Sequence, residues 1–315
     1  MGKKAVLFLI GLAVVIVFPF VSPSPFYVHV ALMVFLYAAM GQSWNILGGF
    51  AGQISLGHAV FFGTGAYTSA ILVSKFAMNP WIGLIAGGFC ALLLSQVIAY
   101  PLFRLAGHYF AVATLVLAEI VQTLMDNWDY CGGASGLWLP ILPEGTLNLQ
   151  FAASKTPYYF VGFALMSVIF FLTYLIRESK WGYYFKAIKD EPETARSRGI
   201  NTALYKSIAF AISAFFMGMV GAYYSQYIMF ISPSGVYLLE LSITSALIPI
   251  LGGMVTLWGP LIGSAVLITL SELSRGYLGG GGKAIDLIVY GLLIMIIAVY
   301  QPKGILGFVQ KRREA

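Results

Sequence analysis

The sequence predicts an all-α protein, a polytopic bundle of about eight to ten transmembrane helices with both termini in the cytoplasm. Three observations predict this fold class. Of the 315 residues, 59% are hydrophobic and only 10% are charged, whereas a soluble domain has about 25% charged residues. Apolar runs of about 20 residues, the length that spans a bilayer, recur along the whole chain. Basic residues gather at the ends of these runs, which is a topology signal rather than a nucleic-acid-binding face.

Individual spans follow from the apolar runs. The first run is interpreted as a retained helix, because no cleavage pattern follows it. Residues 238–274 form a longer apolar stretch that is interrupted by GGMVTLWGP. This stretch is either two spans or a re-entrant hairpin plus one span. The other predicted spans are about 5–22, 26–47, 54–74, 81–103, 106–126, 157–177, 204–229 and 284–301.

The orientation follows from the lysines and arginines, which are enriched in cytoplasmic loops of membrane proteins. With Lys3 and Lys4 inside, fourteen of the 18 basic residues fall on the cytoplasmic side. Four remain outside, namely Lys75, Lys155, Arg275 and Lys283. Residues 1–315 are therefore predicted to form a single transmembrane domain, with an external loop at 127–156 and a cytoplasmic loop at 178–203.

The cytoplasmic loop contains FKAIKDEPETARSRGIN at 185–201, which holds seven of the chain's charged side chains. Asp190 and Glu193 have the spacing of a capping box, Pro192 fits the first turn, and Gly199 can end a helix in the left-handed conformation. We expect a helix of about two turns, which is too short to be stable alone in water. Either it docks against a surface, or the segment is a solvated basic loop.

Polar residues open the predicted third span. Gln53, Ser55, Gly57 and His58 stand together there, and the glycines predict a local break in the helix. Broken membrane helices are tolerated in protein-lined or wet regions, and transporters often place binding sites at them. Two interpretations stay open: these residues line a translocation path, or they serve tight helix packing with satisfied polar groups.

Glu119 is the strongest single candidate within a span, and Gln122 follows about one turn later. An acidic side chain in hydrocarbon is costly, so we expect Glu119 to face the bundle interior or a watery path. It would then either meet the ammonium group of a transported molecule or form a hydrogen bond to a neighbouring helix.

Several stretches resemble LivM-type permeases, the membrane subunits of branched-chain amino acid ABC importers. WGYYFKAIKDEPETARSRGINTALYKSIAFAISAFFMGMVGAYYS is similar to that family's cytoplasmic loop and following helix, and departs from it at Pro192 and Glu193. Its matching positions are Lys186, Ala187, Ile188, Asp190, Ala195, Gly199, Ile200, Lys206, Ala209, Phe210, Ser213 and Ala214. GGFAGQISLGHAVFFGTGAY at 48–67, HYFAVATLVLAEIVQ at 108–122 with CGGASGL at 131–137, and PILGGMVTLWGPLIGSAVL at 249–267 extend the resemblance in order.

The resemblance implies an ATP-driven importer in the prokaryotic cytoplasmic membrane. The chain would translocate leucine, isoleucine or valine delivered by an external binding protein, beside a second homologous permease and two ATPase subunits. ATP and Mg²⁺ would bind the ATPases, and this chain would hold no cofactor and perform no catalysis. The charged loop would be the coupling helix that contacts an ATPase through Lys186, Asp190, Glu191, Glu193, Arg196, Arg198 and Gly199.

Two alternatives concern the cargo and the energy source. Related permeases serve urea or short amides, so the substrate stays open within the family. An ion-coupled secondary amino acid transporter would need carboxylates near the bilayer middle, for which Glu119 is thin support, and it would not need the 185–201 helix. The two cysteines, Cys90 and Cys131, indicate neither a disulfide framework nor a metal site.

Overall fold

The computed structural model describes residues 3–105, 107–151 and 154–278, together with 291, 295 and 304–306. Within these ranges the chain is helical apart from one short strand pair, which confirms the all-α fold class. Six of the described helical segments are long and apolar enough to cross a membrane. The predicted span at 284–301 and the chain ends lie outside the described residues.

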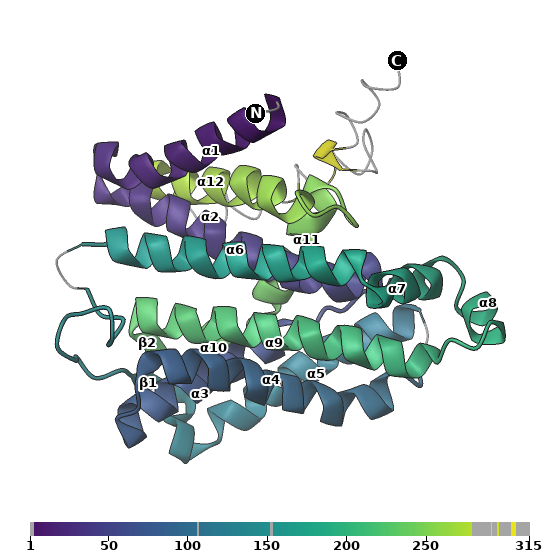
Figure 1. Ribbon diagram of the computed structural model, residues 1–315. Helices are drawn as coiled ribbons and strands as arrows, with labels where there is room; N and C mark the ends of the chain where they lie inside the picture. Colours follow the sequence, from purple (N-terminus) through teal and green to yellow (C-terminus); the bar gives the residue numbers. More distant parts are fainter. Residues whose placement is uncertain are drawn as a thin grey trace.

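The long helices make up the bundle, and shorter elements connect them (Figure 1). The long helices are α1 (Lys3–Val21), α2 (Pro25–Asn45), α3 (Ala59–Phe76), α4 (Pro80–Leu102), α5 (His108–Asp126), α6 (Thr156–Glu178), α9 (Thr202–Ile228), α11 (Leu239–Gly252) and α12 (Gly259–Leu278). The shorter elements are the π-helical turn Ile46–Phe50, the 3-10 turns Asp129–Cys131 and Gly133–Ser135, helices α7 (Lys180–Asp190), α8 (Pro192–Ser197) and α10 (Pro233–Val236), and strands β1 (Leu137–Trp138) and β2 (Phe230–Ile231).

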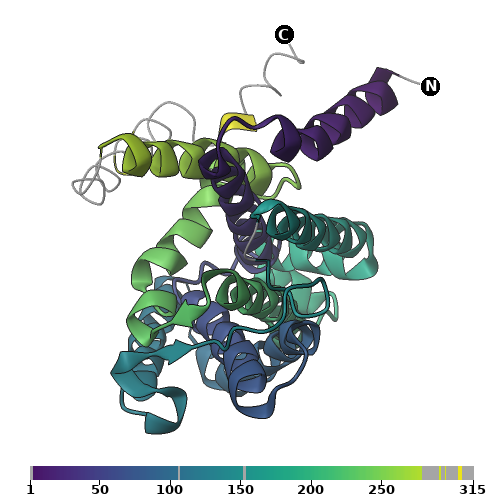
Figure 2. The ribbon, with the colours of Figure 1, turned by 90° about the vertical axis from the view of Figure 1, so that its left-hand side faces the viewer.

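Helix α2 forms the centre of the bundle. Most of its side chains between Val28 and Asn45 are buried, and it contacts α6, α9, α11 and α12. Figure 1 shows it between α12 and α6. A helix that is apolar all round is typical of a buried position, because it has no polar face to turn toward water. In contrast, α1 extends away from the other helices in the end view of Figure 2 and exposes several of its described apolar side chains.

Helices α3, α4 and α9 pack closely because glycines face one another between them. A Cβ atom built on Gly221 of α9 would lie 1.9 Å from the carbonyl oxygen of Phe62 in α3. A Cβ atom on Gly65 would lie 2.0 Å from the carbonyl oxygen of Gly218. Only glycine allows these backbones to approach so closely. Such contacts between small residues are common where membrane helices pack together.

The apolar stretch 238–274 forms two helices, α11 and α12, that lie against each other. A Cβ atom on Gly263 of α12 would lie 2.0 Å from the carbonyl oxygen of Ile248 in α11. The far end of α12 returns to the start of α2, where Gly276 contacts Phe26. This arrangement favours two crossings over a re-entrant hairpin, with the interrupting residues 253–258 forming the connection.

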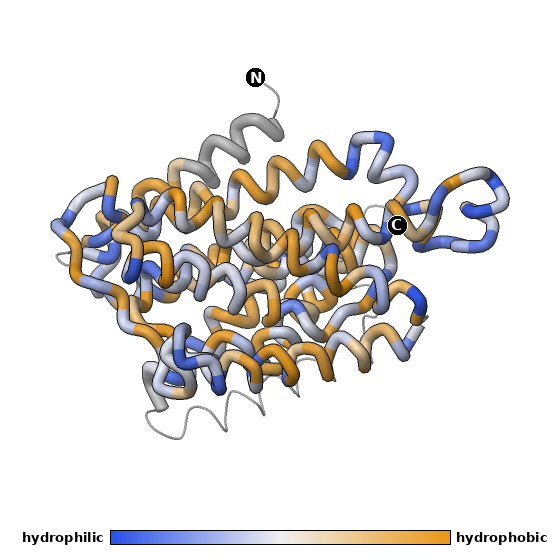
Figure 3. The backbone as a smooth tube through the Cα atoms, turned by 90° about the horizontal axis from the view of Figure 1, so that it is seen from below, coloured by the Kyte–Doolittle hydropathy of each residue, from blue (hydrophilic) through white to orange (hydrophobic). Residues whose placement is uncertain are grey.

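Hydrophilic segments lie at the two ends of the bundle, and hydrophobic residues lie along its middle (Figure 3). At one end, the segment 127–151 folds over the helix ends: Lys75 at the end of α3 lies 3.4 Å from the ring centre of Tyr130. The Trp81 indole N–H also donates to the carbonyl oxygen of Thr146 over 2.8 Å, and β1 pairs with β2. At the other end lie α7 and α8.

Candidate functional site

The charged segment, which is predicted to be cytoplasmic, begins at a tight corner between α6 and α7. Ser179 caps α7, and its hydroxyl oxygen accepts a hydrogen bond of 3.2 Å from the Trp181 amide. A Cβ atom on Gly182 would lie 2.1 Å from the carbonyl oxygen of Arg177, so only glycine fits at this position. The corner holds α7 close to the end of α6.

One face of α7 anchors it to the rest of the molecule. Phe185 and Ile188 are fully buried, while Trp181, Tyr183 and Lys186 are exposed. Helix α7 contacts α6, α9 and the π-helical turn. Burying two large apolar side chains stabilises the docked helix by about 1.5 to 3 kcal/mol each, measured against leaving them in water. The segment is therefore ordered by packing and not by its own helix propensity.

The predicted capping box is wrong. Asp190 is the last residue of α7, and Glu191 is the N-cap of α8 with φ of −156° and ψ of 97°. Glu191 is extended because the ring of Pro192 disfavours the helical conformation in the residue before it. The predicted single helix of about two turns is instead the eleven-residue α7 followed by the six-residue α8. Pro192 opens α8, and Gly199 follows it with φ of +84°, as predicted.

All the residues predicted to contact an ATPase lie on this exposed segment, namely Lys186, Asp190, Glu191, Glu193, Arg196, Arg198 and Gly199. Within the described part of the chain, none of their charged side chains forms an ion pair. Next to them, Lys189 is half-buried, and this burial lowers the pKa of its ammonium group while nearby Asp190 acts in the opposite direction. The geometry brings the predicted residues together at one end of the bundle (Figures 1 and 3).

The second candidate site is the break before α3. Helix α2 continues into the π-helical turn, and residues 51–58 are largely irregular before α3 begins at Ala59. The third span therefore starts about five residues later than the predicted position 54, because the glycine-rich segment does not hold a helix. One α2 side chain holds the break, because the Trp44 indole donates to the carbonyl oxygen of Ser55 over 2.7 Å. The next residue, Asn45, donates to the carbonyl oxygen of Thr256 in the connection between α11 and α12 over 3.0 Å.

His58 lies fully buried at the end of this break and connects three segments. The Ser213 hydroxyl of α9 donates to the carbonyl oxygen of Ser43 over 2.6 Å, so its oxygen accepts from His58 Nε2–H over 2.8 Å. The other ring nitrogen, Nδ1, lies 3.1 Å from the Ser55 hydroxyl. A neutral imidazole with its proton on Nε2 satisfies both contacts. Ser242 of α11 completes the site by accepting from the Ala59 amide over 2.8 Å.

Of the remaining predicted path residues at the break, Gly57 lies beside α5. Gln53 is half-buried and donates to the carbonyl oxygen of Ala51 over 3.4 Å. A Cβ atom on Gly57 would lie 2.2 Å from the carbonyl oxygen of Thr114, and the Thr114 hydroxyl accepts from the Leu56 amide over 2.9 Å. The broken segment thus contacts the middle of α5.

Glu119 lies on α5, but it does not face the interior of this chain. Its side chain is exposed, and Gln122 is half-buried. The surrounding face of α5 is exposed as well and includes Val116 at 47% and Ile120 at 50% of their full accessibility. Of the two surroundings expected for Glu119, the bundle interior is wrong for this subunit, since α5 lies at its edge and turns that face outward. The watery path stays a prediction.

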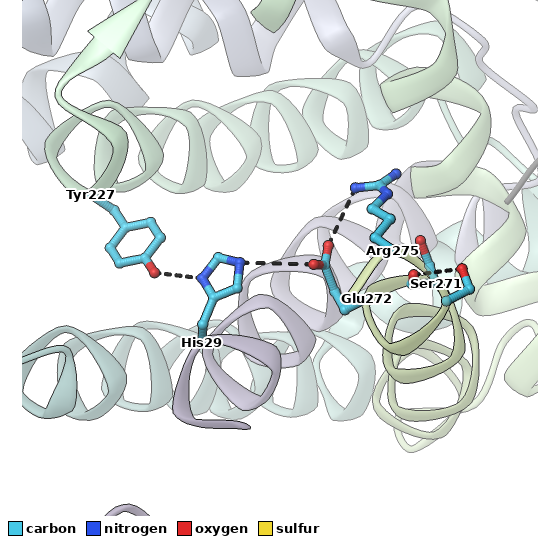
Figure 4. A network of polar contacts seen from close by, with 6 residues as sticks. His29, Tyr227, Ser271, Glu272 and Arg275 are labelled. Carbon is cyan, nitrogen blue, oxygen red and sulfur yellow. Dashed lines mark hydrogen bonds and ion pairs between the residues drawn. The ribbon is translucent and has the colours of Figure 1, made fainter. Parts of the chain in front are cut away.

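A polar network that sequence reasoning missed joins three helices at the other end of the bundle (Figure 4). His29 Nδ1 of α2 lies 2.5 Å from the Tyr227 hydroxyl of α9, and His29 Nε2 lies 3.8 Å from a carboxylate oxygen of Glu272 in α12. Glu272 also pairs with Arg275 over 3.3 Å. No local pattern could reveal this network, because His29 and Tyr227 are 198 positions apart in the sequence.

The fold is that of a multi-pass membrane protein, with a charged segment at one end and a broken helix within the bundle. A sequence profile of the family described as "Branched-chain amino acid transport system / permease component" matches residues 26–298. The chain belongs to this family.

Individual relatives agree with the family assignment. The chain is 27% identical to the high-affinity branched-chain amino acid transport system permease protein LivM of Salmonella typhimurium, over 96% of this chain and 75% of the relative. It is 26% identical to the LivM of Escherichia coli over the same shares. It is also 25% identical to the permease protein LivH of Salmonella typhimurium, over 86% of this chain and 91% of the relative. No solved structure matches the chain.

These findings confirm the predicted resemblance to LivM-type permeases. They also confirm the predicted class, a permease component of an ABC transport system in the cytoplasmic membrane.

Proposed function

We propose that this chain is the permease subunit of an ATP-driven importer that carries leucine, isoleucine and valine, delivered by an external binding protein. The family description and the names of the LivM and LivH relatives support the cargo. The exposed α7–α8 segment supports the mode of action and is the observation that carries the proposal. Its charged side chains have no ion-pair partners in the described part of the chain, so they are available to a partner protein.

The α7–α8 segment would act as the coupling element between the membrane and an ATPase. The charges of α8 would meet a groove of the ATPase, where complementary charge sets specificity. The buried face of α7 would carry the motion to α6, α9 and the π-helical turn, with which α7 is in contact. ATP and Mg²⁺ would bind the ATPase subunits, and hydrolysis would occur there. To switch the permease between its inward-open and outward-open conformations, the nucleotide state needs to favour one of them by a few kcal/mol.

The exposed face of α5 would meet a second, homologous permease, with the translocation path between the two subunits. Glu119 supports this assignment, because a carboxylate on an outward face of a membrane helix is costly unless protein or water covers it. The broken segment with Gln53, Ser55, Gly57 and His58 would reach the path from the buried side of α5, where Thr114 contacts it. Glu119 and Gln122 would then line the path at the subunit interface.

Charge reversal in α8 tests the coupling role. We expect the double variant Arg196→Glu and Arg198→Glu, co-expressed with its ATPase subunits, to recover less ATPase on purification by about tenfold or more. The reason is that like charges placed opposite each other in an interface cost several kcal/mol. The measurement is the ratio of ATPase to permease in the purified complex.

Arg104→Glu is the matched control. Arg104 is also exposed and predicted to be cytoplasmic, but it stacks on Tyr100 at the end of α4, outside the α7–α8 segment. It should leave the ratio unchanged. Full recovery of ATPase by the double variant would contradict the proposal.

A further inference from the structure

A cavity of about 300 Å³ opens beside the corner between α6 and α7. Its walls come from four parts of the chain: the end of α6, one side of α7, the π-helical turn and the connection between α11 and α12. The lining residues are Phe50, Arg177, Glu178, Gly182, Tyr183, Lys186, Lys189, Asp190 and Val255. The cavity therefore lies at the predicted cytoplasmic end of the membrane-spanning helices.

The cavity carries more positive than negative charge. Arg177, Lys186 and Lys189 contribute three cations, and Glu178 and Asp190 contribute two anions. Within the described part of the chain, one ion pair involves these five side chains: Arg177 Nε lies 3.9 Å from Glu178, a long separation between sequence neighbours that are both exposed. The lining thus has an excess of one positive charge, which matches the single negative charge of a phosphodiester.

The most enclosed of these cations is Lys189. Its side chain is half-buried, and burial lowers the pKa of its ammonium group, because the charged form loses hydration. An anion beside it would offset this cost. Gly52 fixes its position: with φ of +71°, the backbone of Gly52 lies against the lysine, and a Cβ atom there would be 2.9 Å from Lys189 Cγ.

An exposed apolar stripe on α6 leads to the cavity. Val168, Phe171 and Leu175 are each about half exposed, and Glu178 continues the stripe into the cavity wall. These positions are three and four residues apart, so they lie on one face of the helix. In a membrane-spanning helix, such a face lies against lipid chains, and its predicted cytoplasmic end lies at the level of the lipid headgroups.

We propose that this cavity binds the phosphate of an anionic phospholipid from the cytoplasmic leaflet, with an acyl chain along the stripe Val168, Phe171 and Leu175. Basic pockets between membrane helices on the cytoplasmic side are suited to such headgroups. The bound lipid would touch both α6 and α7, and would thereby stabilise the corner that positions the charged segment. The proposal goes beyond the transport function and does not depend on it.

Native mass spectrometry of the purified full-length chain tests this site. The protein is titrated with phosphatidylglycerol and separately with phosphatidylcholine, and retained lipid is counted. We expect the wild-type chain to retain phosphatidylglycerol in preference to phosphatidylcholine. The double variant Arg177→Gln and Lys189→Gln should weaken phosphatidylglycerol binding by about tenfold or more, since each basic residue near the surface contributes appreciably to binding anionic lipid.

Lys180→Gln is the matched control, because Lys180 lies on the same helix and outside the cavity lining. It should bind phosphatidylglycerol as the wild type does. The conservative variant Lys189→Arg retains the charge and should retain the preference, which guards against a variant that merely folds poorly.

Three results would overturn the proposal. The first is equal retention of the two lipids by the wild type. The second is retention of phosphatidylglycerol by the double variant at the wild-type level. The third is displacement of phosphatidylglycerol by millimolar inorganic phosphate, which would indicate a site for free phosphate. Because the assay needs no ATPase, its outcome is independent of whether α8 couples to one.

Discussion

At the residue scale, the two intramembrane candidates His58 and Glu119 differ in their surroundings. His58 is enclosed, and both of its ring nitrogens have hydroxyl partners. Glu119 is exposed on the edge of the subunit. A satisfied buried group contributes to stability, whereas a carboxylate on an open face needs a partner from outside the chain. The two sites should therefore respond differently to substitution.

Two variants measure this difference with the same pair of readouts, thermal stability and transport. Ser213→Ala removes the hydroxyl between His58 and Ser43, so it should lower the free energy of unfolding by about 1 kcal/mol, the usual scale for hydrogen bonds in membrane proteins. Glu119→Gln should leave thermal stability nearly unchanged and lower the rate of uptake several-fold. Ser197→Ala, on the exposed surface of α8, is a control for the loss of a hydroxyl.

A drop in stability with unchanged uptake for Glu119→Gln would contradict its place at the path. Unchanged stability for Ser213→Ala would contradict the structural role of the His58 network.

The backbone conformation of an individual residue could be predicted from the sequence where that residue itself determines it. Pro192 and Gly199 occupy the predicted positions because ring geometry and a positive φ are properties of one residue. The prediction of Asp190 as the N-cap is wrong because Pro192 forces an extended conformation on Glu191, which makes Glu191 the N-cap instead. The outward face of Glu119 could not be predicted, because it depends on which neighbours cover α5. The pairing of His29 with Tyr227 likewise depends on the tertiary fold.

At the element scale, the long helices agree closely with the apolar runs, since hydrocarbon thickness sets their length. Helix α7 was missed as an element, although its apolar residues Trp181, Tyr184, Phe185 and Ile188 have the spacing of one helix face. Helix α3 begins at Ala59, later than the predicted position 54, because glycines and tertiary hydrogen bonds, rather than hydropathy, decide where the helix begins. Such contacts cannot be read from one segment alone.

The close approach of α3 and α9 leads to a prediction for Gly221→Ala. The added methyl group would lie 1.9 Å from the Phe62 carbonyl oxygen, so the two helices would have to separate. We expect a loss of about 3 kcal/mol in stability, at the upper end for an overpacked core. The measurement is the thermal midpoint of the purified protein in detergent.

Gly162→Ala is the control for this substitution. Its added methyl group would come no closer than 3.1 Å, and the nearest atom is the hydroxyl oxygen of Tyr223, on a side chain. It should cost less than Gly221→Ala. Helix propensity favours alanine at both positions, so it cannot account for a loss. An equal loss of stability for the two substitutions would contradict the role given to the close approach of α3 and α9.

At the scale of the whole molecule, the two ends of the bundle carry different elements. One end holds α7, α8 and the connection between α11 and α12, and α7 and this connection both line the cavity next to Phe50 and Val255. The other end holds the strand pair, the 3-10 turns and the His29 network. In the proposed coupling, motion at α7 would reach the π-helical turn through direct contact, and the connection at Thr256 through the hydrogen bond from Asn45.

The central claim is that the segment from Asp190 to Gly199 transmits the action of an ATPase to the membrane. The most direct test is ATP-driven leucine uptake into proteoliposomes that contain the complete complex, with this segment either native or replaced by a scrambled sequence of the same composition. We predict that the scrambled segment abolishes ATP-driven uptake, while the total helix content measured by circular dichroism stays nearly unchanged. An intact complex with undiminished ATP-driven uptake would contradict the account.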